Sequence, residues 1–138
     1  MKILEINKFY HQGQDSGGVG SYLFALEQLL KDHGQEVVAF AMNDPQGGPA
    51  RADFLDYLDL KNFGFDLASL KKAGHLIYSP AARAKLERLL AREKPEIAHL
   101  HNIYHQLSPS ILLALKKRQI PVVMTVHDFK LICPNYRL

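Results

Sequence analysis

The amino-acid sequence predicts a doubly wound α/β fold, in which a mostly parallel sheet carries helices on both faces. Apolar runs of strand length alternate with segments of helical periodicity, at intervals of about a dozen residues. The apolar runs are nearly continuous, as expected for parallel strands that are covered on both faces. The chain of 138 residues is predicted to form one domain with a buried core.

Composition and charge exclude several classes of protein. The net charge of +3 favours anionic ligands or an anionic membrane surface. No basic run is interleaved with aromatic residues, which argues against a nucleic-acid partner. No stretch approaches the ~20 apolar residues that cross a bilayer. The single Cys133 excludes an internal disulfide, and with no signal peptide it predicts a cytoplasmic protein, in solution or at the inner face of the membrane.

The first part of the chain predicts a strand, a helix and a second strand. Residues 2–6 form a short apolar run at the N-terminus. From Val19 to Leu30 apolar residues recur at helical spacing, and Gly34, which follows a basic last turn, is a typical helix stop. Residues 37–41 are continuously apolar, so a buried parallel strand is expected there.

Residues 43–76 differ from the rest of the chain. They begin with turn-forming residues, NDPQGGP, and continue with apolar and aromatic residues that show no clean period. We interpret this segment as an irregular excursion within the domain, with short helical turns.

The remainder predicts two further helix–strand units. Ser79–Pro80 is a helix start with Ser as the N-cap and Pro in the first turn, and residues 96–101 are the expected strand after that helix. Ser108–Pro109 opens the next helix. Residues 122–126 are then expected to form a further buried strand.

Polar side chains follow three of the predicted strands. They are Asn7, Lys8, Tyr10, His11, His101, Asn102, Tyr104, His105, His127, Asp128 and Lys130. In an open parallel sheet, ligands bind outside the carboxyl ends of the strands, where the strand order reverses. The sequence therefore predicts a polar binding site at this edge of the sheet.

The residues Gly17, Gly18, Val19 and Gly20 start the first helix. A dinucleotide fingerprint would need a third glycine where Leu23 stands, and the loop from Asn7 to Ser16 is too long for its tight turn. Bare backbone amides at a helix N-terminus still favour an anion. The pattern therefore favours a phosphate-facing loop, with the alternative that the glycines only make the turn.

The histidines suggest hydrogen bonding rather than metal binding. His99 and His101 alternate along a strand and point to one face, and with His105 they resemble zinc ligands. No carboxylate or cysteine is placed in the sequence to complete such a set, so no metal is expected. His127 and Asp128 end a strand, where a histidine is suited to polarise or hydrogen-bond a polar ligand.

Two segments together resemble the N-terminal domain of glycosyltransferase family 4, also called group 1. They are "SGGVGSYLFALEQLLKDHGQEV" and "KPEIAHLHNIYHQLSPSILLALKKRQIPVVMTVHDFKLICPNY". The resemblance implies a GT-B architecture, with two Rossmann-like domains facing each other across a cleft. The N-terminal domain mainly receives the acceptor and the C-terminal domain holds the nucleotide-sugar. Transfer retains the anomeric configuration and needs no bound metal.

The resemblance also assigns roles to individual residues. The loop at Gly17–Gly18 would lie near the donor diphosphate, and His127 would be the catalytic residue that reaches the transferred sugar. His101 and Asn102 would line the cleft. Their places after the predicted strands add Tyr10, His105, Asp128 and Lys130 as further cleft or acceptor residues. Gly20 stands where the family often has a glutamate, so any contact from that carboxylate is lost.

The sequence thus predicts the acceptor-side domain, residues 1–138, of a retaining nucleotide-sugar-dependent hexosyltransferase. The acceptor would be a glycan, a lipid or a small molecule, with no cofactor beyond the nucleotide-sugar co-substrate. The chain stops at Leu138 without the nucleotide-sugar half, so it is expected to be inactive alone. The alternatives are a nucleotide-binding oxidoreductase fragment and a non-catalytic binding module.

Overall fold

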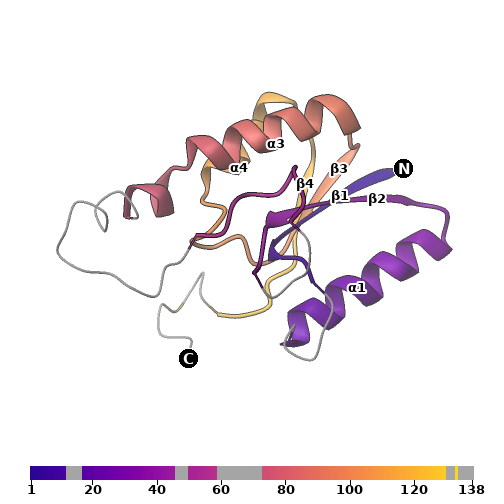
Figure 1. Cartoon of the computed structure of the whole chain (residues 1–138). Helices are drawn as coiled ribbons and strands as arrows, with labels where there is room; N and C mark the ends of the chain where they lie inside the picture. The colour runs from indigo at the N-terminus through magenta and orange to yellow at the C-terminus, as the bar shows by residue number, and fades with distance from the viewer. Residues whose placement is uncertain (12–16, 46–49, 59–72, 130–132, 134–138) are drawn as a thin grey trace.

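Four parallel strands form one sheet in the order β2-β1-β3-β4 (Figure 1). The computed structural model describes residues 1–11, 17–45, 50–58, 73–129 and 133. The strands are β1 (Lys2–Phe9), β2 (Glu36–Met42), β3 (Ile97–Leu100) and β4 (Val122–Met124). The helices are α1 (Gly17–Asp32), α3 (Pro80–Glu93) and α4 (Ser110–Lys117). The predicted α/β class with a parallel sheet is confirmed.

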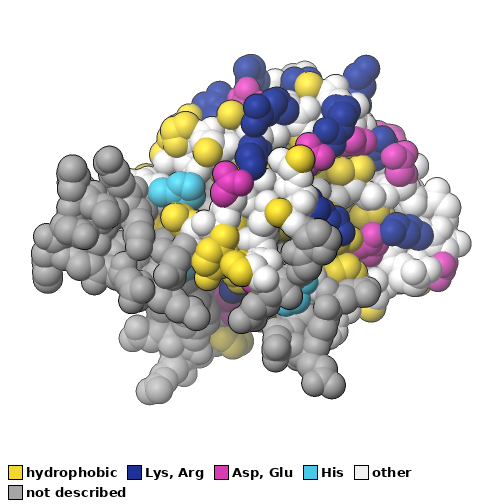
Figure 2. Space-filling model, viewed as in Figure 1, with side chains coloured by type: hydrophobic (Ala, Val, Ile, Leu, Met, Phe, Trp, Pro, Cys, Tyr) yellow, Lys and Arg dark blue, Asp and Glu magenta, His cyan; other side chains and the backbone are white. Residues whose placement is uncertain are grey.

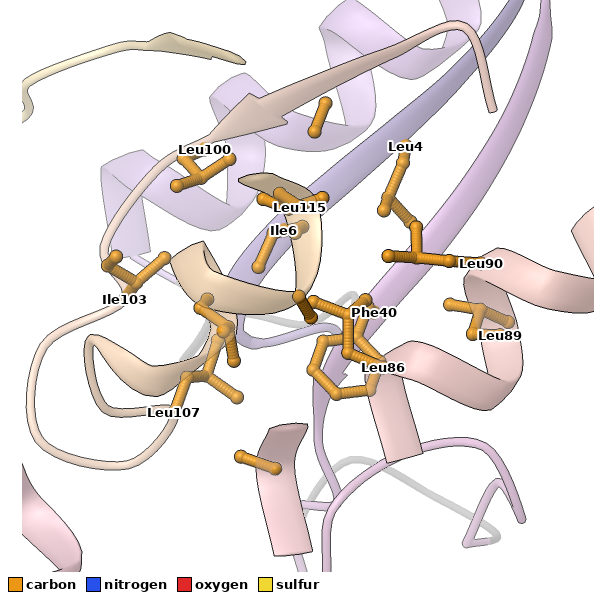
Figure 3. Packing of buried hydrophobic residues seen from close by; sticks show 14 of the residues in the cluster. Leu4, Ile6, Phe40, Leu86, Leu89, Leu90, Leu100, Ile103, Leu107 and Leu115 are labelled. Carbon is orange, nitrogen blue, oxygen red and sulfur yellow. The ribbon is translucent and has the colours of Figure 1, made fainter. Parts of the chain in front are cut away.

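Helices lie on both sides of the sheet, with α1 on one face and α3 and α4 on the other (Figure 1). Successive side chains of a strand point to opposite faces. On β1, Leu4 and Ile6 therefore join the apolar core beneath α3 and α4, together with Phe40, Leu86 and Leu115 (Figure 3). The intervening Glu5 points to the opposite face, which α1 covers, and this carboxylate becomes central to the site.

The helix boundaries follow the expected local chemistry. Ser79 is the N-cap of α3, and its Oγ accepts a hydrogen bond of 3.1 Å from the backbone N–H of Ala82. Gly34 adopts a φ of 72° after α1, and its N–H bonds to the carbonyl of Lys31 at 2.9 Å. Ser108 lies two residues before α4, and its hydroxyl also reaches the N–H of Ser79 at 3.1 Å. The predicted helix starts are confirmed, and this serine contact links the two helices.

The strand predicted over residues 122–126 is shorter and more exposed than expected. β4 ends at Met124, and Val122 and Val123 are 45% and 50% exposed. Within the described sheet β4 pairs with β3 alone, so it is an edge strand with one uncovered side. The prediction of a buried strand is wrong because an apolar run indicates strand formation and not the number of neighbouring strands. His127 consequently lies beyond the strand and is held by other contacts.

The described parts of the segment 43–76 pack against the sheet. Leu55 forms an isolated bridge with Met42 at the end of β2, and both Phe54 and Leu55 are buried. Residues 73–77 are helical. Residues 46–49 and 59–72 of the predicted excursion lie outside the described residues.

Charged side chains crowd the surface on the side of α3, where Lys and Arg lie beside Asp and Glu (Figure 2). Arg92 forms an ion pair with Asp53 at 2.8 Å, and Arg83 pairs with Glu87 at 2.9 Å. Paired surface charges of this kind form a solvated face rather than a concentrated basic patch. Among the described residues, no helix combines the length and the apolar character that crossing a membrane requires.

The sheet order places a reversal point beside β1. From β1 the chain passes through α1 to β2 on one side, while β3 pairs with the other side of β1. Connections that leave in opposite directions open a crevice at the carboxyl ends of these strands, where ligands of such sheets bind. The residues that end β1 and follow β3 are therefore the ones to inspect.

Candidate functional site at the carboxyl ends of the strands

A hollow of about 320 Å³ opens where β1, β3 and α1 meet. We call it the glycine hollow. It is lined by Asn7, Lys8, Phe9, His11, Gly17, Gly18, Val19, Gly20 and Asn102. All four residues of the predicted phosphate loop are among them. The structure thus brings the start of α1 to the predicted edge of the sheet.

The first turn of α1 presents backbone to the glycine hollow. Gly17 has a φ of 63°, a conformation that residues with a side chain rarely adopt. A Cβ added at Gly17 or Gly18 would meet nothing within 4 Å, so the backbone there stands open. Unpaired N–H groups at a helix start attract an anion, and Lys8 from β1 adds a positive charge to the same hollow.

Two asparagines join the ends of β1 and β3. The side-chain Oδ1 of Asn7 accepts a hydrogen bond of 3.2 Å from the backbone N–H of Asn102, and the carbonyl of Asn102 accepts one of 2.9 Å from the N–H of Lys8. Asn102 is only 8% exposed, and its Oδ1 has no hydrogen-bond partner among the described residues. A buried acceptor without a partner costs free energy, so a donor on a ligand would fit this position.

Beside the glycine hollow, four ionisable side chains form a continuous chain of contacts, which we call the histidine cluster. Glu5 Oε2 lies 2.6 Å from His101 Nε2, and Glu5 Oε1 lies 3.2 Å from His99 Nδ1. His101 Nδ1 in turn lies 2.9 Å from His127 Nε2. Glu5 and His101 are 1% and 0% exposed, so the chain runs from the interior of the sheet to the half-buried His127.

Neighbouring groups set the charges of the cluster. Burial raises the pKa of the Glu5 carboxyl, but hydrogen bonds from His101 and His99 outweigh burial and hold this pKa below its usual value. Burial, together with His101 and His99, lowers the pKa of His127, although Asp128 opposes that effect. Glu5 is therefore an anion at neutral pH, and His127 is a neutral imidazole.

The side chains of Glu5, His99 and His101 could also face a metal ion, since one ligand atom of each lies within 4.8 Å of the others. Two ligands of one tetrahedral zinc ion stand about 3.3 Å apart, given usual bond lengths near 2 Å. The 2.6 Å contact between Glu5 and His101 is shorter and is a hydrogen bond. His105, which the sequence grouped with these histidines, is exposed and lies outside this set.

Tyr10 and His11 face a second hollow of about 290 Å³, between α1 and the segment around Arg51. The ring of Tyr10 packs on Phe24 with centroids 4.8 Å apart, and its hydroxyl donates a hydrogen bond to Glu27. Burial and Glu27 raise the pKa of Tyr10 well above its usual value. The structure therefore separates Tyr10 from His101 and Asn102, with which the sequence grouped it.

The remaining predicted residues take different positions. Asp128 lies close enough to His127 to favour its protonated form. Lys130 lies outside the described residues. Asn7 and Lys8 belong to β1 itself, because that strand continues to Phe9, whereas the sequence placed them after it.

Sequence reasoning missed Glu5. It is a charged residue in an otherwise apolar run at the centre of the sheet, and a carboxylate is almost never fully buried unless it is paired. A carboxylate within the apolar run of residues 2–6 was the signal that could have identified Glu5 as a paired, functional residue. Tyr22 of α1 was also missed, and the centroids of its ring and the ring of His127 lie 5.1 Å apart in a T-shaped arrangement.

Comparisons with known proteins identify the family of this chain. The sequence profile of Glycosyltransferase Family 4 matches residues 16–137. A phosphatidyl-myo-inositol mannosyltransferase of Mycolicibacterium smegmatis is 27% identical over 112 residues, which are 80% of this chain and 27% of that protein. The chain thus spans about a quarter of the length of this relative. The matched profile covers most of the chain, and the chain belongs to glycosyltransferase family 4.

Proposed function

We propose that this chain is the acceptor-side domain of a retaining glycosyltransferase that uses a nucleotide-sugar. The observation that carries the proposal is that Asn102, which lines the glycine hollow, directly follows His101 of the histidine cluster, at the reversal point of the sheet. The glycine hollow offers an anion site, and the histidine cluster offers the neutral imidazole of His127. A sugar diphosphate would contact both. Family membership favours glycosyl transfer over the oxidoreductase alternative.

The geometry suggests what each part would do. The amides of Gly17–Gly20 and the ammonium of Lys8 would hold the donor diphosphate. Asn102 Oδ1, which is buried without a partner among the described residues, would accept a hydrogen bond from a ligand hydroxyl. His127 would contact the transferred sugar. Such fixed groups act by stabilising charge that develops in the transition state.

We propose a chemical class for the transferred sugar and for the acceptor. The relative is named as a mannosyltransferase, which supports a hexose as the transferred sugar. Its name also specifies a phosphatidylinositol acceptor, so a lipid is the acceptor class to test first, before a glycan or a small molecule. The net charge of +3 would favour peripheral contact with an anionic membrane that carries such a lipid. We propose that no metal takes part, because hydrogen bonds already engage the nitrogens of His101.

The first test concerns the need for a second domain. The purified 138-residue chain is expected to transfer no sugar from a panel of radiolabelled nucleotide-hexoses, because we assign the donor site mainly to a second domain. Thin-layer separation of labelled products measures this directly, with lipid, glycan and small-molecule acceptors in separate reactions. Robust turnover by the chain alone would overturn the two-domain proposal.

The second test concerns the glycine hollow. Gly18→Ala is expected to weaken binding of inorganic pyrophosphate about tenfold, or about 1.4 kcal/mol, because the added methyl group stands where the anion approaches. The fold should persist, since this methyl group meets nothing within 4 Å. Isothermal titration calorimetry on the 138-residue chain gives the dissociation constants.

Gly74→Ala is the matched control for this test. Gly74 also has open space around its Cβ position, but it lies in the helical residues 73–77 and does not line the hollow. The control should bind pyrophosphate as the unmodified chain does. If Gly18→Ala binds as tightly as Gly74→Ala, the glycines only make the turn.

A further inference from the structure

The contacts of the histidine cluster restrict which of its ring nitrogens carry protons. An ionised carboxylate can only accept hydrogen bonds. Glu5 therefore accepts one hydrogen bond from the N–H at His99 Nδ1, at 3.2 Å, and one from the N–H at His101 Nε2, at 2.6 Å. The other nitrogen of His99 lies 2.7 Å from the hydroxyl of Thr125, which can donate to it. Glu5 thus determines the tautomer of both buried rings.

The contact between His101 and His127 then holds one further proton. His101 Nδ1 and His127 Nε2 lie 2.9 Å apart, and two bare nitrogens would repel each other at this distance. When both rings are neutral, His101 carries its proton on Nε2, and the bridging proton belongs to His127 Nε2. Nδ1 of His127 is then left unprotonated.

We propose that Glu5 acts through His101 as a positioning residue for His127, fixing its ring with the Nε2–H turned inward and Nδ1 left as an acceptor toward the ligand. The inference rests on the proposed function only for the identity of that ligand. The ring contacts agree, since His101 and His127 stack with centroids 5.2 Å apart and the edge of Tyr22 lies against His127. The buried Glu5 and His101 thereby set the position and the tautomer of the His127 ring.

The arrangement also determines where an added proton goes. When His127 Nδ1 takes a proton from a ligand hydroxyl, the bridging proton can pass from His127 Nε2 to His101 Nδ1. The O–H bond of the hydroxyl breaks and leaves an alkoxide on the ligand, while N–H bonds form at His127 Nδ1 and His101 Nδ1 and the His127 Nε2–H bond breaks. The positive charge then lies on His101, next to the Glu5 carboxylate. Among the described residues, the charged or titratable groups that face this pair are Glu5, His99, Tyr22 and Asp128.

Nitrogen-15 NMR of the histidine rings in the 138-residue chain tests the tautomers without any activity assay. At a pH at which both rings are neutral, we expect His101 and His127 to be protonated at Nε2 and not at Nδ1. A neutral His127 protonated at Nδ1 would overturn the proposal. Because this measurement needs no variant and no sugar, its result stands apart from success or failure of the proposed function.

Glu5→Gln tests the role of the buried charge. A neutral amide fixes the tautomer of His101 less firmly than a carboxylate does, because hydrogen bonds to an ionised acceptor are roughly twice as strong. The nitrogen-15 signals of His101 and His127 in Glu5→Gln should therefore show a mixture of tautomers at a pH at which both rings are neutral. Thr125→Val is the matched control, because it removes a hydrogen bond from His99 but leaves the contact between His101 and His127. Equal tautomer populations of His101 and His127 in Glu5→Gln and Thr125→Val would overturn the proposal. If Glu5→Gln does not fold, the tautomers of His101 and His127 measured in the unmodified chain test the proposal by themselves.

Discussion

Replacing His127 with alanine is expected to lower kcat by on the order of a hundredfold or more, the usual effect of losing one preorganised stabilising contact. Under the proposed function, the variant is made in a protein that joins this domain to the proposed nucleotide-sugar domain. The expectation rests on placement, since His127 follows the sheet and stands at the outer end of the histidine cluster. Steady-state kinetics with a saturating nucleotide-sugar measure the change.

The rigidity of His127 has a different origin from the one the sequence suggested. The strand before it ends at Met124 and is exposed, so strand pairing does not hold its backbone. The ring is held instead by His101 Nδ1 at 2.9 Å and by the edge of Tyr22. Because the side chain is only half-buried, its removal should leave the fold intact, which circular dichroism checks.

His33→Ala is the matched control for this substitution. His33 is an exposed histidine that follows α1, and its Nδ1 lies 2.8 Å from the carbonyl of Leu29. The control should retain normal kcat. If His127→Ala also keeps a near-normal kcat, or if it fails to fold, the catalytic assignment of His127 is wrong.

Replacing Leu115 with alanine is expected to lower the free energy of unfolding by about 2–5 kcal/mol. Leu115 is 0% exposed and packs from α4 into the core formed with β1, β2 and α3 (Figure 3). Removing its side chain leaves a cavity that the close-packed neighbours fill only in part. Urea denaturation of the 138-residue chain, followed by circular dichroism, gives the difference.

Leu113 lies on the same helix and is 45% exposed, so Leu113→Ala makes the same chemical change at a surface position. The control should change the stability by no more than about 0.5 kcal/mol. Equal losses from the two substitutions would mean that the apolar core does not lie between α4 and the sheet.

Much of the fold could be predicted because its signals are local. Ser79 before Pro80 and Gly34 after a basic turn are chemical signals for helix ends, and both mark the boundaries that the structure has. The continuous apolar run at residues 37–41 likewise lies within β2. Exposure of β4 could not be predicted this way, because it depends on which strands lie beside it.

Some features of the candidate site could likewise be predicted from local sequence, and others could not. The alternation of His99 and His101 predicted that both rings share one face, and they lie with centroids 4.3 Å apart. The position of Gly17–Gly20 at a helix start was also predicted, and these residues line the glycine hollow. Tyr10 was grouped with Asn102 because both follow strands, yet its ring turns to Phe24 and Glu27.

By itself, then, the sequence determined the class of fold, the family, and the edge of the sheet where polar side chains gather, because periodicity, caps and motifs lie within short stretches of chain. Only the tertiary structure decided that Glu5 lies opposite His99 in the strand register and bonds to His101. Those residues are more than 90 positions apart, at separations of 94 and 96. The strand order that joins them arises from packing the whole sheet against its helices, and no local pattern contains that information.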